Sequence, residues 1–125
     1  MPALHKTSPL VLIVEDEWIV RDCTAAQLEE AGCDVLEAAD AEAALRQFQA
    51  NAHVTTLFTD INMPGPIDGL SLAHKIAVMR PAVQLILTSG RAAPAPSEMP
   101  PGGQFLPKPY DYNRLTSLIR FPPRA

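Results

Sequence analysis

The sequence lacks the features that mark several classes of protein. It has 10 lysine and arginine residues against 14 aspartate and glutamate residues, for a net charge of −4, so it has no basic excess of the kind that nucleic-acid-binding domains carry. No apolar run approaches the roughly 20 residues that a membrane-spanning helix needs. We therefore expect a protein that binds neither nucleic acid nor a membrane.

Cysteine is scarce as well. Cys23 and Cys33 are the only two cysteines, and neither CxxC nor histidine-rich spacing accompanies them, which favours free thiols in a reducing compartment over a disulfide or a zinc site. The first nine residues lack the charged and then apolar segments of an export signal. We expect a cytoplasmic protein in which Cys23 lies on the core side of a helix.

The chain does have enough apolar material for a single core, since 47% of its 125 residues are hydrophobic. Short apolar or alternating runs predict strands, and segments with apolar residues every three or four positions predict helices between them. Such alternation is typical of an α/β fold, in which helices cover both faces of a parallel sheet. The predicted strands are residues 10–14, 34–38, 54–59, 83–87 and 104–106.

The prolines are unevenly distributed. Six of the thirteen lie between Pro94 and Pro109, where a helix would otherwise connect the fourth strand to the fifth. Inside a helix each proline removes a hydrogen-bond donor and clashes with the preceding turn, at a cost of about 3 kcal/mol. We predict that this fourth crossover is short or irregular, with at most one helical turn.

Polar residues that can carry chemistry follow four of the predicted strands, and in chain order they are Glu15-Asp16, Asp60, Thr88-Ser89 and Lys108. Taken singly, each of the first three has an ordinary alternative: a solvated acidic turn, a loop-capping aspartate and a helix cap. In a doubly wound sheet, however, the carboxyl ends of the strands face one side, and ligands bind there. We therefore expect these side chains to meet.

Three carboxylates that converge on one point repel one another, and a hard divalent cation relieves that repulsion. Oxygen ligands without histidine or cysteine favour Mg²⁺, which usually shares its coordination shell with a phosphate. A phosphoryl group in the same pocket would find a hydroxyl donor in Thr88 and a cation in Lys108. These components predict a site for phosphoryl transfer.

Four motifs resemble those of the response-regulator receiver domain, in that family's order: VLIVEDE, TDINMPG with DGL after it, ILTSG and FLPKPY. The resemblance implies a flavodoxin-like (βα)₅ doubly wound parallel sheet with strand order 2-1-3-4-5. It covers residues 10–121, which leaves residues 1–9 as a flexible lead-in and residues 122–125 as a tail. Because the similarity ends with the last helix, we expect a receiver without an output domain.

Residue roles follow from the same resemblance. Asp60 would be the phosphoacceptor, with Thr88 bonded to a phosphoryl oxygen and Lys108 paired with Asp60 or its phosphoryl group. Mg²⁺ would be bound by four residues: the carboxylates of Asp16 and Asp60, the backbone carbonyl of Asn62, and Glu15 through a metal-bound water. Two further positions match the family, a switch aromatic at Phe105 and a cis peptide bond before Pro109.

Two departures from the family pattern bear on function. Phe105 lacks the hydroxyl that tyrosine carries at this position in many relatives, so no phenol hydrogen bond can anchor an outward-facing state. Many relatives also dimerise through their fourth helix, fifth strand and fifth helix. With prolines in the fourth crossover, that dimer surface is doubtful in this chain.

These inferences lead to a function. A histidine kinase or histidine phosphotransfer protein would donate a phosphoryl group to Asp60, and the signal would pass to a downstream protein by contact, with no catalysis beyond self-phosphorylation and self-dephosphorylation. The alternative is an interaction module that keeps the fold and works without phosphorylation. An aspartyl phosphatase is disfavoured, because such enzymes place the nucleophile on the first strand with a second Asp two residues later, and Glu15-Asp16-Glu17 lacks that pair.

Overall fold

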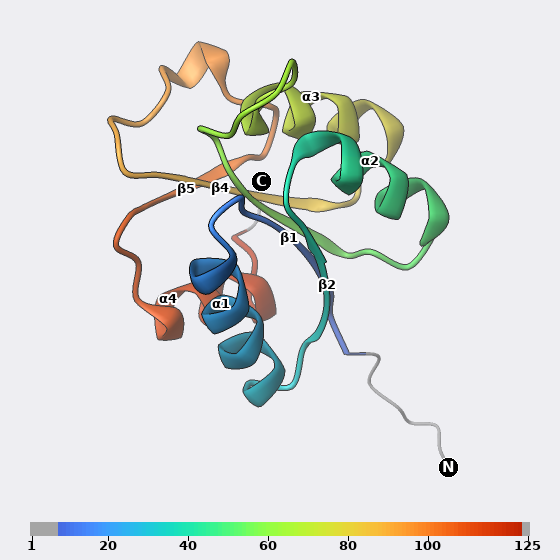
Figure 1. Cartoon of the computed structure of the whole chain (residues 1–125), viewed down its shortest axis with the longest axis vertical. Coiled ribbons are helices and arrows are strands. Elements are labelled where there is room, and N and C mark those ends of the chain that lie inside the picture. Colours follow the sequence, from blue (N-terminus) through green and yellow to red (C-terminus); the bar gives the residue numbers. More distant parts are fainter. Residues whose placement is uncertain (1–7, 124–125) are drawn as a thin grey trace.

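A computed structural model describes residues 8–123, which form a five-stranded parallel sheet between two layers of helices (Figure 1). The strand order is β2-β1-β3-β4-β5, which confirms the predicted doubly wound topology. The strands are β1 (Leu10–Val14), β2 (Asp34–Ala38), β3 (Thr56–Asp60), β4 (Gln84–Ser89) and β5 (Gln104–Pro107).

Four α-helices pack on the sheet, two on each face. In Figure 1, α1 and α4 lie together on one side of the strands, and α2 and α3 lie together on the other. Their bounds are α1 (Trp18–Glu30), α2 (Ala41–Ala50), α3 (Gly69–Met79) and α4 (Tyr112–Arg120). No helix within residues 8–123 is long and apolar enough to cross a membrane.

The two faces of the sheet make two separate cores. On the side of α2 and α3, Leu12, Leu57 and Leu87 pack with helix residues such as Phe48 and Ile76. On the side of α1 and α4, the alternate residues of the same strands pack with Leu28 of α1 and Leu115 of α4. These strand residues include Val11, Ile13, Phe58 and Ile86. Because successive strand residues face opposite sides, burial on both faces explains why the central strands are continuous apolar runs.

Aspartate begins three of the four helices. Asp40, Asp68 and Asp111 are the N-cap residues of α2, α3 and α4, and each accepts a hydrogen bond on its side chain from a backbone N–H of the first turn. Such caps stabilise a helix by about 1 kcal/mol. Gly32 follows α1 with a φ of 94°, a conformation that glycine adopts without strain, and it lets the chain turn into β2.

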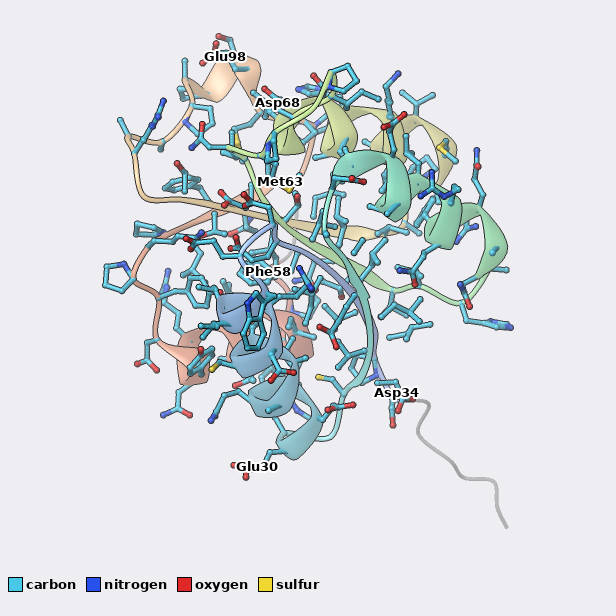
Figure 2. The ribbon with its side chains drawn as sticks, viewed as in Figure 1. Glu30, Asp34, Phe58, Met63, Asp68 and Glu98 are labelled. Atoms are coloured by element: carbon cyan, nitrogen blue, oxygen red, sulfur yellow. The ribbon has the colours of Figure 1, made fainter. Side chains whose placement is uncertain are left out.

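The fourth crossover, residues 90–103, holds only one turn of 3₁₀ helix, η1 (Pro96–Glu98). The prediction that prolines break this helix is confirmed. Figure 1 shows the segment as a long loop that projects beyond the sheet, and Figure 2 shows Glu98 on its helical turn. A hydrogen bond of 2.6 Å between His74 Nε2 and the Glu98 carbonyl ties this loop to α3.

The last three strands differ from the prediction by one or two residues at their ends, and β5 extends one residue further, to Pro107. Residues 54 and 55 precede β3, and β4 begins one residue late because Val83 N–H donates to Arg80 O in a turn. At its other end β4 continues through Thr88 and Ser89, since Ser89 pairs in register with Pro107 of β5. The two hydroxyl residues therefore belong to the sheet rather than to a flexible turn.

The prediction that Cys23 faces the core is wrong. Cys23 is exposed, and the buried residues of α1 are Thr24, Ala25 and Leu28. Apolar spacing alone did not distinguish Cys23 from Thr24, and the structure turns the threonine inward because its hydroxyl has a partner in Tyr110 OH at 2.9 Å. The proposed boundaries of lead-in and tail remain predictions, and residues 1–7 and 124–125 lie outside the described residues.

Candidate functional site

The first acidic pair lies directly after β1. Glu15 is buried and Asp16 is exposed. The Glu15 N–H donates to Ala38 O of β2 at 3.1 Å, and the Glu15 carbonyl accepts from Arg21 Nη1 of α1 at 2.7 Å. Glu15 is therefore held on two sides by its backbone, which leaves its carboxylate directed by fixed geometry rather than by solvent.

Asp60 is the last residue of β3 and is 6% exposed. Its Oδ1 accepts from the Asn62 N–H at 3.2 Å, so the loop that follows closes over the carboxylate. The amino end of α3 packs against the same point, because a Cβ placed on Gly69 would lie 1.8 Å from Asp60 O. Only glycine permits this approach of helix to strand end.

Lys108 joins the two buried acids. Its Nζ donates to Glu15 Oε1 at 2.8 Å and to Asp60 Oδ2 at 3.0 Å. Burial acts to lower the pKa of Lys108, but the hydrogen bonds to Glu15 and Asp60 outweigh it and raise the pKa above its ordinary value. Lys108 therefore stays an ammonium ion between the two carboxylates.

Burial has the opposite consequence for its acidic partner. Desolvation raises the pKa of Glu15 above the ordinary value of a glutamate, against the lowering effect of the Lys108 hydrogen bond. A buried carboxylate of this kind gains from a cation that replaces its lost hydration.

Three carboxylates meet beside Lys108. Oxygen atoms of Glu15, Asp16 and Asp60 all lie within 4.8 Å of one another, two from buried residues and one from an exposed residue. This donor set contains oxygen only and opens to solvent at Asp16, which fits Mg²⁺, a cation that keeps several water ligands. The residues present are therefore suited to hold the cation that the sequence predicts.

Thr88 lies opposite Asp60 across the β3–β4 pair. It is 2% exposed, and its Oγ1 has no hydrogen-bond partner within residues 8–123. A buried polar group without a partner costs about 1 to 3 kcal/mol, so the Thr88 hydroxyl is free to bond a group that enters the site.

The remaining predicted residues have distinct positions. The Asn62 side chain bonds to Ser89 Oγ at 2.7 Å, and the peptide bond between Lys108 and Pro109 is cis, as expected. Phe105 is half-buried in β5 and pairs with Leu87 of β4, one residue before the pair of Thr88 and Leu106. Its role as a switch residue stays a prediction.

Sequence reasoning missed two contacts that hold this site together. Arg21 bonds the Glu15 carbonyl and also forms an ion pair of 3.4 Å with Glu37 of β2. Tyr110, two residues after Lys108, bonds Thr24 and packs edge-on against Phe58 at a ring-centroid distance of 5.2 Å. Arg21 has no sequence signal, whereas Tyr110 could have been noticed as the polar-tipped aromatic beside the lysine.

Comparisons with known proteins support the site's assignment to a family. The family model of the response regulator receiver domain matches residues 11–120. The transcriptional regulatory protein AruR of Pseudomonas aeruginosa is 40% identical over 87 residues, 66% of this chain and 35% of AruR. The sensor kinase CckA of Brucella abortus is 32% identical over 117 residues, 90% of this chain and 12% of CckA. The chain thus spans about a third or less of these relatives.

Solved structures show the same fold. The crystal structure of the receiver domain from the hybrid histidine kinase CckA has a TM-score of 0.76 at 36% identity and covers 89% of this chain and 95% of that one. A response regulator receiver protein from Sinorhizobium medicae has a TM-score of 0.85 at 24% identity, with 90% and 92% covered. By sequence and fold together, this chain belongs to the response regulator receiver domain family.

Proposed function

We propose that this receiver domain accepts a phosphoryl group on Asp60 from a phosphohistidine. The observation that carries the proposal is the arrangement around Asp60: its carboxylate bonds Lys108 at 3.0 Å and lies in register with Thr88, whose buried hydroxyl has no partner in the described part of the chain. A phosphoryl group on Asp60 would satisfy both neighbours at once.

The transfer is written as an in-line displacement. A carboxylate oxygen of Asp60 attacks phosphorus, an O–P bond forms, the P–N bond breaks, and the imidazole leaves with the donor. Lys108 neutralises charge on the phosphoryl oxygens, and the Asn62 N–H holds the carboxylate in place. Water later attacks the acyl phosphate, which returns the carboxylate and releases inorganic phosphate. The protein catalyses nothing beyond these two steps on itself.

A divalent cation belongs to the proposal. Glu15, Asp16 and Asp60 would hold Mg²⁺ together with the Asn62 carbonyl, and the cation would supply charge neutralisation for the transferring group. Support comes from the convergence of the three carboxylates within 4.8 Å. Thr88 would donate its hydroxyl to a phosphoryl oxygen, and Phe105 would follow that movement to change the surface that a partner meets.

The donor and recipient are proteins of a two-component system. A histidine kinase or a histidine phosphotransfer protein would supply the phosphoryl group, since relatives include a sensor kinase and a transcriptional regulatory protein. The downstream protein would bind the changed surface by contact in the cytoplasm.

The decisive experiment is labelling with acetyl phosphate and Mg²⁺, followed by intact-mass spectrometry. We expect one phosphoryl group on the wild type and none on Asp60→Asn or in EDTA. The matched control is Asp68→Asn, which changes an exposed carboxylate of the neighbouring loop to another good N-cap residue and should label normally. Equal labelling of wild type and Asp60→Asn would refute the proposal.

An interaction module that works without phosphorylation is the competing function. It would leave the Thr88 hydroxyl unsatisfied throughout its life, which is why we favour the phosphorylated protein. The fluorescence of Trp18 distinguishes the two functions, because Trp18 is 66% exposed and lines the same shallow pocket as Asp16. Mg²⁺ or beryllofluoride should change its fluorescence, whereas a silent titration supports the module.

A further inference from the structure

Ser89, the residue after Thr88, has no part in the proposed chemistry, yet it is tightly held. It ends β4 and is 2% exposed. Its Oγ accepts from Asn62 Nδ2 at 2.7 Å and from the Arg91 N–H at 3.0 Å. One hydroxyl oxygen therefore bonds both the loop after β3 and the first residues of the fourth crossover.

One of these two bonds has a local explanation and the other does not. A serine hydroxyl that accepts from the N–H two residues later is ordinary turn chemistry, and the Arg91 bond is of that kind. The Asn62 bond spans 27 residues of sequence. It therefore joins the loop after β3 to the end of β4, two segments that only the assembled sheet brings together.

Asn62 lies in the loop after β3, next to the Asp60 carboxylate. Its N–H donates to Asp60 Oδ1 at 3.2 Å, and the preceding residue, Ile61, donates its N–H to Thr88 O at 2.9 Å. Asn62 is itself exposed, so packing does not hold it. The bond from its side chain to buried Ser89 is what ties this exposed residue to the end of β4.

We propose that Ser89 is a positioning residue for the metal site: through the Asn62 side chain it fixes the loop that carries the Asn62 carbonyl, which would be a ligand of the cation. The inference rests on the proposed function and adds a residue to it. When the bond is lost, the loop in the free protein samples more conformations, and the binding-competent fraction falls. Apparent affinity falls by that same fraction.

The test is a Mg²⁺ titration of wild type, Ser89→Ala and Asn62→Ala, followed by Trp18 fluorescence and by calorimetry. Loss of one hydrogen bond of ordinary strength should weaken Mg²⁺ binding about three- to ten-fold in either variant. Asn62→Ala keeps the backbone carbonyl and changes an exposed position, so it tests the inference even where Ser89→Ala folds poorly. Ser71→Ala, an exposed serine of α3, should bind as wild type does.

The double variant isolates the bond itself. If Ser89 and Asn62 act through their mutual hydrogen bond, the double variant should bind Mg²⁺ no more weakly than either single variant. In NMR spectra, Mg²⁺ should also shift the Arg91 amide of the wild type, since the same Ser89 oxygen accepts from it, and shift it less in Asn62→Ala.

The outcomes separate this inference from the function on which it rests. The role of Ser89 is overturned if both single variants bind Mg²⁺ with the affinity of the wild type. It is also overturned if the loss of Mg²⁺ affinity in the double variant equals the product of the two single losses. Either result leaves the phosphoacceptor proposal intact. A wild type that binds no Mg²⁺ overturns both.

Discussion

At the scale of single residues, the site combines satisfied and unsatisfied polar groups in one small volume. Lys108 donates to two buried carboxylates. Thr88, which pairs with Asp60 on the neighbouring strand, has a hydroxyl with no partner in the described residues. An unsatisfied group in a native core needs an explanation, and a transferable ligand explains it better than imperfect packing.

This difference predicts that removal of the hydroxyl has opposite effects on stability at two buried threonines, Thr88 and Thr59. Thr88→Val removes a buried hydroxyl without a partner, and should raise the free energy of unfolding by about 1 kcal/mol. Thr59→Val removes an equally buried hydroxyl that donates to Asp60 O at 2.9 Å, and should lower it by about the same amount. Urea denaturation in EDTA measures both. Destabilisation by Thr88→Val would mean that its hydroxyl has a partner in solution.

The two cysteines should react differently. Burial raises the pKa of the Cys33 thiol, so at pH 8 it carries less thiolate than an ordinary cysteine, and it is also shielded. Cys23 is exposed. Iodoacetamide should therefore modify one thiol per native chain, and Cys23→Ser should abolish the reaction. Rapid modification of two thiols in native wild type would contradict the packing of Cys33.

At the scale of elements, the close approach of α3 to the end of β3 sets the geometry of the site. Gly69 opens α3 against Asp60 O, so the helix, the strand end and the loop between them form one rigid corner. That loop comprises residues 61–68, and Figure 2 labels two of its residues, Met63 and Asp68. A change in this corner would move Asp60 itself.

Gly69→Ala tests the corner. The added Cβ would lie 1.8 Å from Asp60 O and within 3 Å of further backbone atoms, so strand or helix must shift, and the free energy of unfolding should fall by about 1 to 3 kcal/mol or more. Gly90→Ala is the control, because nothing lies within 4 Å of its added Cβ, and its effect should be within about 0.5 kcal/mol. Thermal and urea unfolding compare the two. Similar stabilities for both variants would refute the close packing.

At the scale of the whole molecule, the cation should act as a ligand of the folded state alone. Three acids and one lysine come from β1, β3 and β5 and their following loops, so the site exists only when the sheet is assembled. Mg²⁺ should therefore raise the free energy of unfolding with the logarithm of its concentration above Kd, by about 2.7 kcal/mol at 100 times Kd, and the unfolding temperature should rise with it.

Removal of the metal and of one ligand checks this linkage. EDTA should reverse the shift, and Asp16→Asn should abolish most of it, since Asp16 supplies the exposed carboxylate of the cluster. Glu42→Gln changes an exposed acid of α2 outside the cluster and should respond to Mg²⁺ as wild type does. Equal stabilisation of Asp16→Asn by Mg²⁺ would locate the cation elsewhere.

Much of the fold and of the candidate site is predictable from the sequence, because the features concerned depend on residues close together in the chain. Contacts between residues far apart in the chain are not predictable in this way. The apolar run before Asp60 and the prolines after Pro94 act locally, so β3, its terminal carboxylate and the broken crossover are predictable. The bond from Asn62 to Ser89 joins residues 27 apart, and the inward turn of Thr24 in place of Cys23 depends on Tyr110 far along the chain. Such contacts exist only after the strands are ordered, and local pattern does not encode them.

The crossover between β4 and β5 changes what a partner meets. Residues 90–103 contain four prolines and a single 3₁₀ turn, so exposed side chains such as Arg91 and Glu98 are not spaced along a helical ridge there. Proline fixes φ and restricts the free segment beforehand. A protein that docked here would therefore lose little entropy in ordering the segment, and its contacts would not follow helical periodicity.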